Sequence, residues 1–283
     1  MKFKRKCKTI VCLMLSVLLF AGAAFEVSAA STPSPKKKFS NYFKSEAELG
    51  KYVDKKFLAH KKTIVFYSDR SDLMQWFLPR YPTCKLEEYS VMFAGVRPKF
   101  RAKIEAMQAP YFGVYKYTVK PKYKNSKAND KKFYSKVKSV AKKARKQKGV
   151  YAKAKYINSY VTGHVRYKRN TKTISTAYTA IMKGTAMCQG YSDTFTIIAR
   201  CAGLKCETVM GDATPYSSYR PAYHAWNVVK KGKKWYNIDV TFNDIGSNKT
   251  RYLMVGSKKF NRNHKLDPYY KRSGWLKSHP FKK

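Results

Sequence analysis

Two strand-like segments on either side of a lysine-rich connection constrain the fold of this chain most. Residues 223–229 (YHAWNVV) and 235–240 (WYNIDV) are rich in aromatic and β-branched residues, and the connection between them contains Gly232. Strands that are joined by so short a connection form an antiparallel hairpin. The sequence therefore predicts an antiparallel sheet in the C-terminal half of the chain.

The register of this hairpin decides which side chains meet. A two-residue turn at Lys231–Gly232 places His224 opposite Asp239, and a four-residue loop over 230–233 gives the same pairing. A three-residue loop would shift the register by one and put the two side chains on opposite faces. Directly opposed side chains have Cβ atoms about 5 Å apart. Either even-numbered loop thus predicts a contact between an imidazole and a carboxylate.

A cysteine begins the helix predicted before this hairpin. The residues CQGYSD start at Cys188, and Gly203 is the predicted stop signal. The apolar residues that follow at helical spacing are Phe195, Ile198, Ala199 and Ala202. At a helix N-terminus, the helix dipole and the unpaired backbone N–H groups stabilise a thiolate, and the same N–H groups can bind the oxyanion of a tetrahedral intermediate.

Together, Cys188, His224 and Asp239 supply a nucleophile, a base and a carboxylate that orients the base. This is the set that covalent acyl transfer uses. Each residue alone has a simpler explanation, because a lone cysteine in an apolar helix is usually inert packing and a lone histidine on a strand is usually structural. The combination of a cysteine at a helix start with an in-register His–Asp pair favours catalysis.

The first 29 residues resemble a secretory signal peptide. Five basic residues precede an uncharged stretch from Ile10 to Phe25, and Val27-Ser28-Ala29 fits a small-residue cleavage site. The alternative is an uncleaved membrane anchor, but this stretch is shorter than the roughly 20 apolar residues that span a bilayer. We therefore expect a secreted, extracellular protein without a transmembrane span in the mature chain.

The charge of the chain indicates a polyanionic partner. Sixty Lys and Arg against 16 Asp and Glu give a net charge of +44, which becomes +40 when five bases and Glu26 leave with the signal peptide. A hydrophobic fraction of 44% excludes a disordered polycation. Export and the lack of a recognised nucleic-acid module argue against nucleic acid, so we expect anionic cell-wall polymers or a host surface.

The cysteines do not form a disulfide scaffold or a recognisable metal site. Cys7 and Cys12 lie in the signal peptide, so the mature chain keeps Cys84, Cys188, Cys201 and Cys206. Four cysteines in a domain of this size are not needed as staples, and no paired C-x-x-C spacing occurs. Cys201 and Cys206 could form a disulfide or could be two small core residues, and the sequence leaves both open.

The rest of the chain divides by composition. Ser45 begins a helix with a capping pattern, and periodicity predicts a basic amphipathic helix that ends before Gly149. Predicted strands lie at 62–67, 88–93 and 111–119. The predicted order is a signal peptide (1–29), a leader or linker (30–38), an N-terminal α/β region (39–120), a basic helix or linker (121–149) and a catalytic domain (150–283).

Three sequence blocks resemble the transglutaminase-like superfamily, in its bacterial secreted form. The blocks are Cys188-Gln189-Gly190-Tyr191, His224-Ala225-Trp226-Asn227 and Trp235 to Phe242, in the family's order and approximate spacing. The resemblance covers about residues 150 to 265. It implies an α+β fold with a papain-like core, in which the helix that carries the cysteine packs on an antiparallel sheet, preceded by a smaller α/β region.

The resemblance also implies roles for the site residues. Cys188, His224 and Asp239 would be the catalytic triad, and Gln189, Gly190, Tyr191, Trp226 and Asn227 would support it. Animal enzymes of this family need calcium, but the sequence has no acidic loop of that kind, so we expect no metal and no cofactor. In those enzymes a tryptophan follows the nucleophile, whereas Gln189 follows it here, which puts glutamine-selective cross-linking in doubt.

These features predict an exported cysteine enzyme that acts on amide or peptide bonds through a thioester acyl-enzyme. Its substrate would be a protein or peptide, with the peptides of peptidoglycan among the candidates. Resolution of the acyl-enzyme by water would make it a peptidase or deamidase, and resolution by an amine would make it a cross-linker; we favour hydrolysis. The alternative is a basic cell-wall or polyanion-binding protein with a vestigial thiol site.

Overall fold

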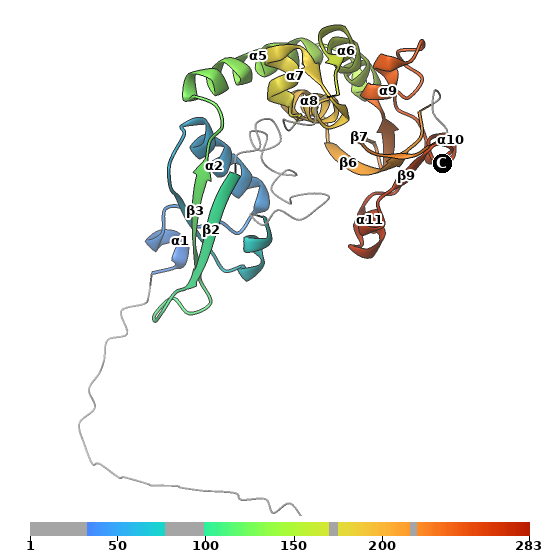
Figure 1. Cartoon of the computed structure of the whole chain (residues 1–283). Helices are drawn as coiled ribbons and strands as arrows, with labels where there is room; N and C mark the ends of the chain where they lie inside the picture. Colours follow the sequence, from blue (N-terminus) through green and yellow to red (C-terminus); the bar gives the residue numbers. More distant parts are fainter. Residues whose placement is uncertain (1–32, 77–98, 170–174, 216–219) are drawn as a thin grey trace, which may run out of the picture. The chain divides into compact units, whose positions relative to one another are not determined.

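The computed structural model describes residues 33–76, 99–169, 175–215 and 220–283 (Figure 1). The predicted signal peptide, the strand predicted at 88–93 and Cys84 lie outside the described residues. In the described ranges, no helix combines the length and apolar character that a membrane crossing requires.

The N-terminal region contains an antiparallel three-stranded sheet in the order β1-β3-β2. Its elements are α1 (Pro35–Lys38), α2 (Glu46–Leu58), β1 (Ile64–Ser68), the 3-10 helix η1 (Ser71–Trp76), β2 (Lys99–Ala106) and β3 (Tyr115–Lys122). The predicted cap is confirmed, because the Ser45 hydroxyl accepts a hydrogen bond from the Glu48 N–H. Strand β3 begins at Tyr115 and not at the predicted Tyr111, since the chain turns there and Gly113 has a left-handed φ of 81°.

Helix α5 shows the predicted two-faced pattern. The helices of this part are α5 (Lys127–Arg145), α6 (Gly149–His164), α7 (Ala177–Lys183) and α8 (Cys188–Cys201), and α8 contacts the other three. The buried apolar residues of α5 are Phe133, Val137, Val140, Ala141 and Ala144, while its lysines are exposed. Gly149 does not follow α5 directly as a stop signal but is the first residue of α6, with a φ of 77°.

The central sheet has four antiparallel strands in the order β8-β7-β6-β9. Its strands are β6 (Cys206–Ala213), β7 (Ala222–Lys231), β8 (Lys234–Ile238) and β9 (His264–Leu266), and the two-stranded parallel sheet beside α8 consists of β4 (Arg166–Tyr167) and β5 (Thr185–Ala186). Helix α8 packs against β7 and β6. The predicted α+β fold, with a cysteine-bearing helix on an antiparallel sheet, is therefore confirmed.

The predicted hairpin exists, but its register differs by two residues from the predicted one. Lys231 pairs with Lys234 and Asn227 with Ile238, so the turn is Gly232–Lys233. Gly232 has a φ of 59° and occupies the first turn position, where a type II′ turn requires a glycine. The prediction placed this glycine second. A shift of two keeps every side chain on its own face, so His224 and Asp239 share a face but are not directly opposed.

Short elements complete the C-terminal part. They are α9 (Val240–Ile245), α10 (Ser257–Phe260), α11 (Tyr269–Arg272) and α12 (Trp275–Ser278). Helix α12 and the residue after it contact Glu207 in β6, whose carboxylate accepts a hydrogen bond from Trp275 Nε1 at 3.0 Å and lies 2.9 Å from His279 Nε2. Burial alone would raise the pKa of Glu207. The contacts with His279 and Trp275 outweigh this effect and lower the pKa.

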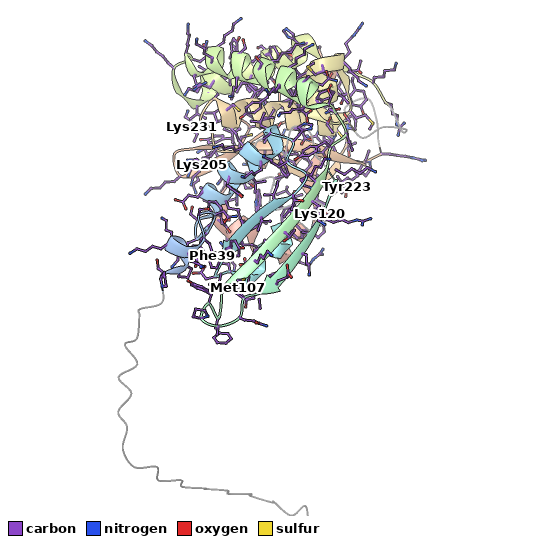
Figure 2. All side chains as sticks on the ribbon, turned by 90° about the vertical axis from the view of Figure 1, so that its left-hand side faces the viewer. Phe39, Met107, Lys120, Lys205, Tyr223 and Lys231 are labelled. Carbon is purple, nitrogen blue, oxygen red and sulfur yellow. The ribbon has the colours of Figure 1, made fainter. Side chains whose placement is uncertain are left out.

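Exposed lysines also lie outside helix α5. Lys120 in β3, Lys205 before β6 and Lys231 in β7, labelled in Figure 2, are all exposed. The positive charge is therefore a property of the whole surface and is not confined to the basic helix.

Candidate active site

Cys188 is the first residue of α8 and is partly exposed. The preceding residue, Met187, is the N-cap, and its N–H donates a hydrogen bond of 2.8 Å to Ser175 Oγ. The backbone N–H groups of the first helical turn have no partner within the helix, so they point out at its start, next to the thiol. The predicted setting of Cys188 at a helix N-terminus is thus confirmed.

Gly190 lets the start of α8 approach the segment before α7 closely. A Cβ at this position would lie 2.5 Å from Ser175 Oγ and 2.7 Å from Ala186 Cβ. Because Ser175 also holds the Met187 N–H, a larger residue at position 190 would disturb the contact that fixes the N-cap. Gly190 therefore supports the position of Cys188 through packing.

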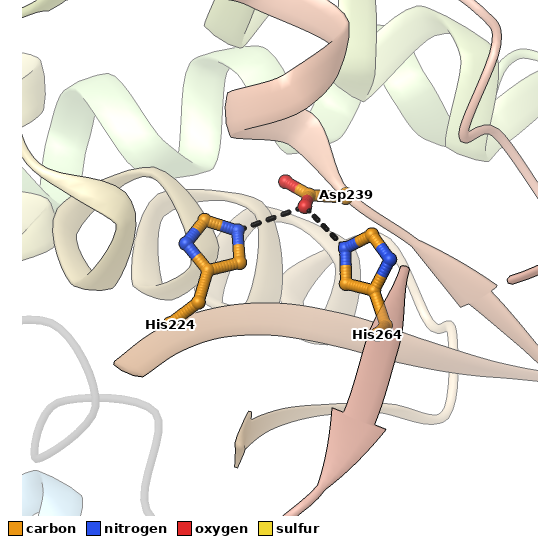
Figure 3. Close-up of side chains that lie close together, drawn as sticks. All are labelled: His224, Asp239 and His264. Atoms are coloured by element: carbon orange, nitrogen blue, oxygen red, sulfur yellow. Dashed lines mark hydrogen bonds and ion pairs between the residues drawn. The ribbon is translucent and has the colours of Figure 1, made fainter. Parts of the chain in front are cut away.

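His224 and Asp239 meet although they are not directly opposed. His224 Nε2 lies 2.8 Å from Asp239 Oδ2, the His224 side chain is 9% exposed and that of Asp239 is fully buried. Burial alone would lower the pKa of His224, but the Asp239 carboxylate and a hydrogen bond with the Cys188 thiol outweigh it and raise this pKa well above its ordinary value. Nε2 faces Asp239, so Nδ1 is the ring nitrogen that makes no bond to this carboxylate (Figure 3).

The Asp239 carboxylate has three hydrogen-bond partners. Its Oδ1 accepts the Phe242 N–H at 2.9 Å, which makes Asp239 the N-cap of α9, and its Oδ2 lies 2.9 Å from a second imidazole nitrogen, Nε2 of His264. Burial would raise the pKa of this carboxyl, but the two histidines lower it well below its ordinary value. Asp239 is therefore ionised and held in one orientation.

The sequence did not predict His264. It follows Asp239 by 25 residues and lies on a strand of only three residues, where no alternation can be recognised. The partner of a carboxylate at such a separation becomes visible only when the sheet order β7-β6-β9 is known.

Tyr167 is a second residue that the sequence did not single out. It pairs with Ala186 across the parallel β4–β5 contact and is 44% exposed. Burial raises the pKa of its phenol, and the neighbouring Cys188 raises it further. Tyr167 is therefore a candidate neighbour of the nucleophile.

Gln189 and Tyr191 each have hydrogen-bond partners in the fold. Gln189 Nε2 donates to Asp193 Oδ1 at 2.8 Å, one turn further along α8. The buried Tyr191 hydroxyl lies 2.8 Å from the Val165 carbonyl and 2.5 Å from Asp244 Oδ2, and burial together with Asp244 raises its pKa. Tyr191 therefore ties α8 to Val165 and Asp244, whereas the bond of Gln189 lies within α8. The supporting roles of both residues stay predictions.

Trp226 and Asn227 belong to the buried part of β7. Asn227 Nδ2 donates to Ser192 O and to Thr196 Oγ1 of α8, each at 2.9 Å. Trp226 is 1% exposed, and its Nε1 donates to Asn237 Oδ1 at 3.4 Å. The predicted supporting set therefore surrounds the site, and its roles in the reaction stay predictions.

Among the described residues, His224, Asp239 and His264 form the one group of potential metal-ligating side chains whose ligand atoms all lie within 4.8 Å. Both Nε2 atoms are 2.8–2.9 Å from a single oxygen, which is a hydrogen-bond spacing. A bound cation would need both Nε2 atoms deprotonated and would replace the His224–Asp239 bond. We therefore describe the cluster as hydrogen-bonded, and the absence of a metal requirement stays a prediction.

The other described cysteines are free thiols. Cys201 ends α8 and Cys206 begins β6, and neither is in a disulfide. Burial raises the pKa of Cys201 to about 11 and that of Cys206 to about 12. At neutral pH both thiols are therefore protonated and unreactive.

One family model matches part of the chain. Residues 138–240 match the family model described as the transglutaminase-like superfamily, so the resemblance predicted from the sequence is confirmed. The match begins inside α5 and ends at Val240, whereas the resemblance predicted from the motifs covered about 150 to 265. No curated protein matches the chain.

Three solved structures are similar to parts of this chain. A candidate cysteine protease from Cytophaga hutchinsonii is 13% identical, with 51% of this chain and 64% of that chain covered and a TM-score of 0.31. A structure described as a TGase is 18% identical, with 64% and 52% covered and a TM-score of 0.30. A candidate protease from Parabacteroides distasonis is 8% identical, with 62% and 39% covered and a TM-score of 0.30. The chain thus spans less than two thirds of each.

Proposed function

We propose that this chain, whose residues 138–240 are transglutaminase-like, is a cysteine enzyme that acts on amide or peptide bonds through a thioester acyl-enzyme. One observation carries the proposal. The imidazole of His224 interacts with the Cys188 thiol at a helix start while its Nε2 faces the buried, ionised Asp239. A raised pKa of His224 makes its imidazole a strong base for the proton of the attacking thiol.

In the first half of the reaction, the Cys188 thiolate attacks the carbonyl carbon and forms a C–S bond. The negative charge moves to the carbonyl oxygen, which the free N–H groups at the start of α8 can bind. Collapse of this intermediate breaks the C–N bond, and the His224 imidazolium gives its proton to the leaving amine. The products are a thioester on Cys188 and a free amine.

In the second half, water or an amine attacks the thioester carbonyl and gives a proton to His224. The C–S bond then breaks and releases a carboxylic acid or a new amide, and the proton on His224 returns to the Cys188 sulfur. We favour water as the acceptor. Export, a place in the cell wall or extracellular space and a protein or peptide substrate are further parts of the proposal, supported by residues 1–29 and by the charge of +44.

Mass spectrometry of peptide products tests this function. The mature protein is incubated with a glutamine-containing peptide and an amine donor, because cleaved, deamidated and cross-linked products differ in mass. Cys188→Ala should abolish every product. Cys201→Ala is the matched control, since this thiol lies at the other end of the same helix and should not matter. Products that persist in Cys188→Ala would exclude the proposal.

A second candidate is polyanion binding with a vestigial thiol site. It is favoured by one observation, the exposed basic side of α5, which carries eight lysine and arginine residues between Lys127 and Arg145. Binding of this kind weakens steeply as the salt concentration rises. It would be the main function if Cys188→Ala left all binding and cell-wall phenotypes intact while changes on α5 abolished them.

A further inference from the structure

His264 reaches Asp239 because β9 lies unusually close to β6. Ala213 pairs with His264 and Gly211 with Leu266, and a Cβ on Gly211 would lie 2.1 Å from the Lys265 carbonyl oxygen. Only glycine permits this approach. The His264 side chain is fully buried, and its ring stacks on Phe260 with centroids 3.8 Å apart.

Both ring nitrogens of His264 face oxygen atoms. Nε2 lies 2.9 Å from Asp239 Oδ2 (Figure 3), and Nδ1 lies 2.9 Å from Asn263 Oδ1. The orientation of the Asn263 amide follows from its other contacts, because its Nδ2 donates to the Thr214 carbonyl at 3.0 Å. A flipped amide would place two acceptors against each other there.

This arrangement fixes the protons on the ring. A carboxylate and an amide oxygen are both acceptors, so each ring nitrogen has to carry a hydrogen to bind its partner. A ring with one proton would leave one of the two buried contacts without a hydrogen, which is costly in a site that water does not reach. The fully bonded state of His264 is therefore the imidazolium.

We propose that His264 is a positioning residue that, as a buried imidazolium, shares the Asp239 carboxylate with His224 and so limits how tightly His224 holds its proton. The ionisable groups that face His264 are Asp239 after β8, His224 from β7 with ring centroids 6.1 Å apart, and Tyr252 with centroids 5.4 Å apart. Its other ring neighbours are Trp226, Phe242 and Phe260, which carry no charge.

The role of His264 in catalysis rests on the proposed function. In the acyl-transfer cycle, His224 gives a proton to the leaving amine and takes one back from the acceptor. If the buried Asp239 carboxylate bound His224 alone, the His224 imidazolium would hold its proton too firmly for this exchange. The positive charge of His264 neutralises Asp239 from the other side and repels the charge on His224, so it eases the proton transfer.

Nitrogen NMR of ¹⁵N-histidine-labelled protein tests the protonation directly. The chain has five histidines, and single variants of His60, His164, His224 and His279 leave His264 assigned by elimination, so no folded His264 variant is required. We expect both nitrogens of His264 to carry a proton at neutral pH. A spectrum with one protonated and one bare nitrogen would overturn the proposal.

The effect on His224 is tested by an NMR titration of its ring in His264→Gln. The side-chain amide nitrogen of glutamine can occupy the position of the histidine Nε2. The variant therefore keeps a donor to Asp239 and removes the positive charge. The titration midpoint of His224 should move up by about 1 pH unit, the effect of removing a nearby like charge. His279→Gln is the matched control, because His279 is also buried against a carboxylate, Glu207, and should cause no shift.

An unchanged or lower midpoint of His224 in His264→Gln would contradict the proposal. This failure is distinct from failure of the proposed function, because the NMR signals do not depend on any product. If Cys188-dependent products are absent while His264 is doubly protonated and the midpoint moves, the shared carboxylate stands and the acyl-transfer function does not.

Discussion

Asn227 in β7 is hydrogen-bonded to the backbone of Ser192 in α8, with 2.9 Å between Nδ2 and the carbonyl oxygen. The second N–H of the same amide donates to Thr196 Oγ1, also at 2.9 Å. In return, the Ser192 hydroxyl donates to the Ala225 carbonyl of β7 at 2.9 Å. Because α8 carries Cys188 and β7 carries His224, these bonds set the spacing between the two reactive side chains.

Asn227→Leu should therefore lower both stability and activity. The leucine has a similar volume but removes the donor of both bonds to α8; Thr196 Oγ1 keeps its contact with Thr208 Oγ1 at 2.9 Å, so the main loss is at the Ser192 carbonyl. We expect a decrease of about 1–3 kcal/mol in the free energy of unfolding, measured by urea denaturation. Asn129→Ala on the exposed side of α5 is the control and should change little. Equal stability of the two variants would show that the bonds do not hold α8.

Gly190→Ala tests the close packing at the start of α8. The new methyl group would meet Ser175 Oγ at 2.5 Å and Ala186 Cβ at 2.7 Å, so Met187 and Cys188 have to move. We expect a loss of about 1–3 kcal/mol of stability and slower alkylation of Cys188 by iodoacetamide. Gly163→Ala is the matched control, because a Cβ there meets nothing within 4 Å in helix α6 and should stabilise the protein by up to about 1 kcal/mol. A Gly190→Ala protein as stable as the control would contradict this packing.

The sequence was sufficient to predict the helix that starts at Cys188 and to predict which side chains of the hairpin share a face. Both depend on short-range signals: a run of apolar residues with helical spacing, and two strands that are joined by a few residues. The exact register was wrong, because the turn type depends on whether Gly232 is the first or second turn residue, and both arrangements suit the flanking lysines. The contact between His224 and Asp239 survived this error because the shift was even.

Contacts between distant segments could not be predicted. His264 reaches Asp239 only because the three-residue strand β9 pairs with β6 beside Gly211. No local sequence pattern predicts such a pairing. The same holds for His60 after α2, whose Nε2 lies 2.9 Å from the buried Asp130 of α5, a separation of 70 residues. Such buried polar pairs are specified by tertiary packing, which a periodicity analysis does not contain.

The pKa shifts of Asp239 and His224 predict how stability depends on pH. The pKa of Asp239 is lowered below 3.8, so its contribution is complete above pH 3.8 and is lost as the pH falls through the lowered value. The pKa of His224 is raised above 6.5, so its contribution is complete below pH 6.5 and is lost as the pH rises through the raised value. The pair therefore stabilises the fold most between pH 3.8 and 6.5.

Urea denaturation of the wild type and His224→Gln from pH 4 to 10 measures this contribution. The difference in unfolding free energy between the two proteins should be constant up to about pH 6.5 and should shrink at higher pH. His164→Gln is the control, since this histidine is exposed and bonds to the Tyr160 carbonyl of its own helix. A difference that grows with pH would mean that His224 is held as the neutral ring.

The exposed side of α5 predicts where polyanion binding would be weakened. A quadruple variant changes Lys131, Lys136, Lys138 and Lys142 to glutamine, all exposed residues on this helix. A control variant makes the same change in net charge elsewhere, at the exposed Lys120, Lys205, Lys231 and Lys277. Binding to immobilised polyphosphate is measured over a range of salt concentrations. If α5 is a binding face, the first variant should lose more affinity and show a shallower salt dependence than the control, because fewer counterions are released. Equal losses in the two variants would instead assign the binding to the charge of the whole surface.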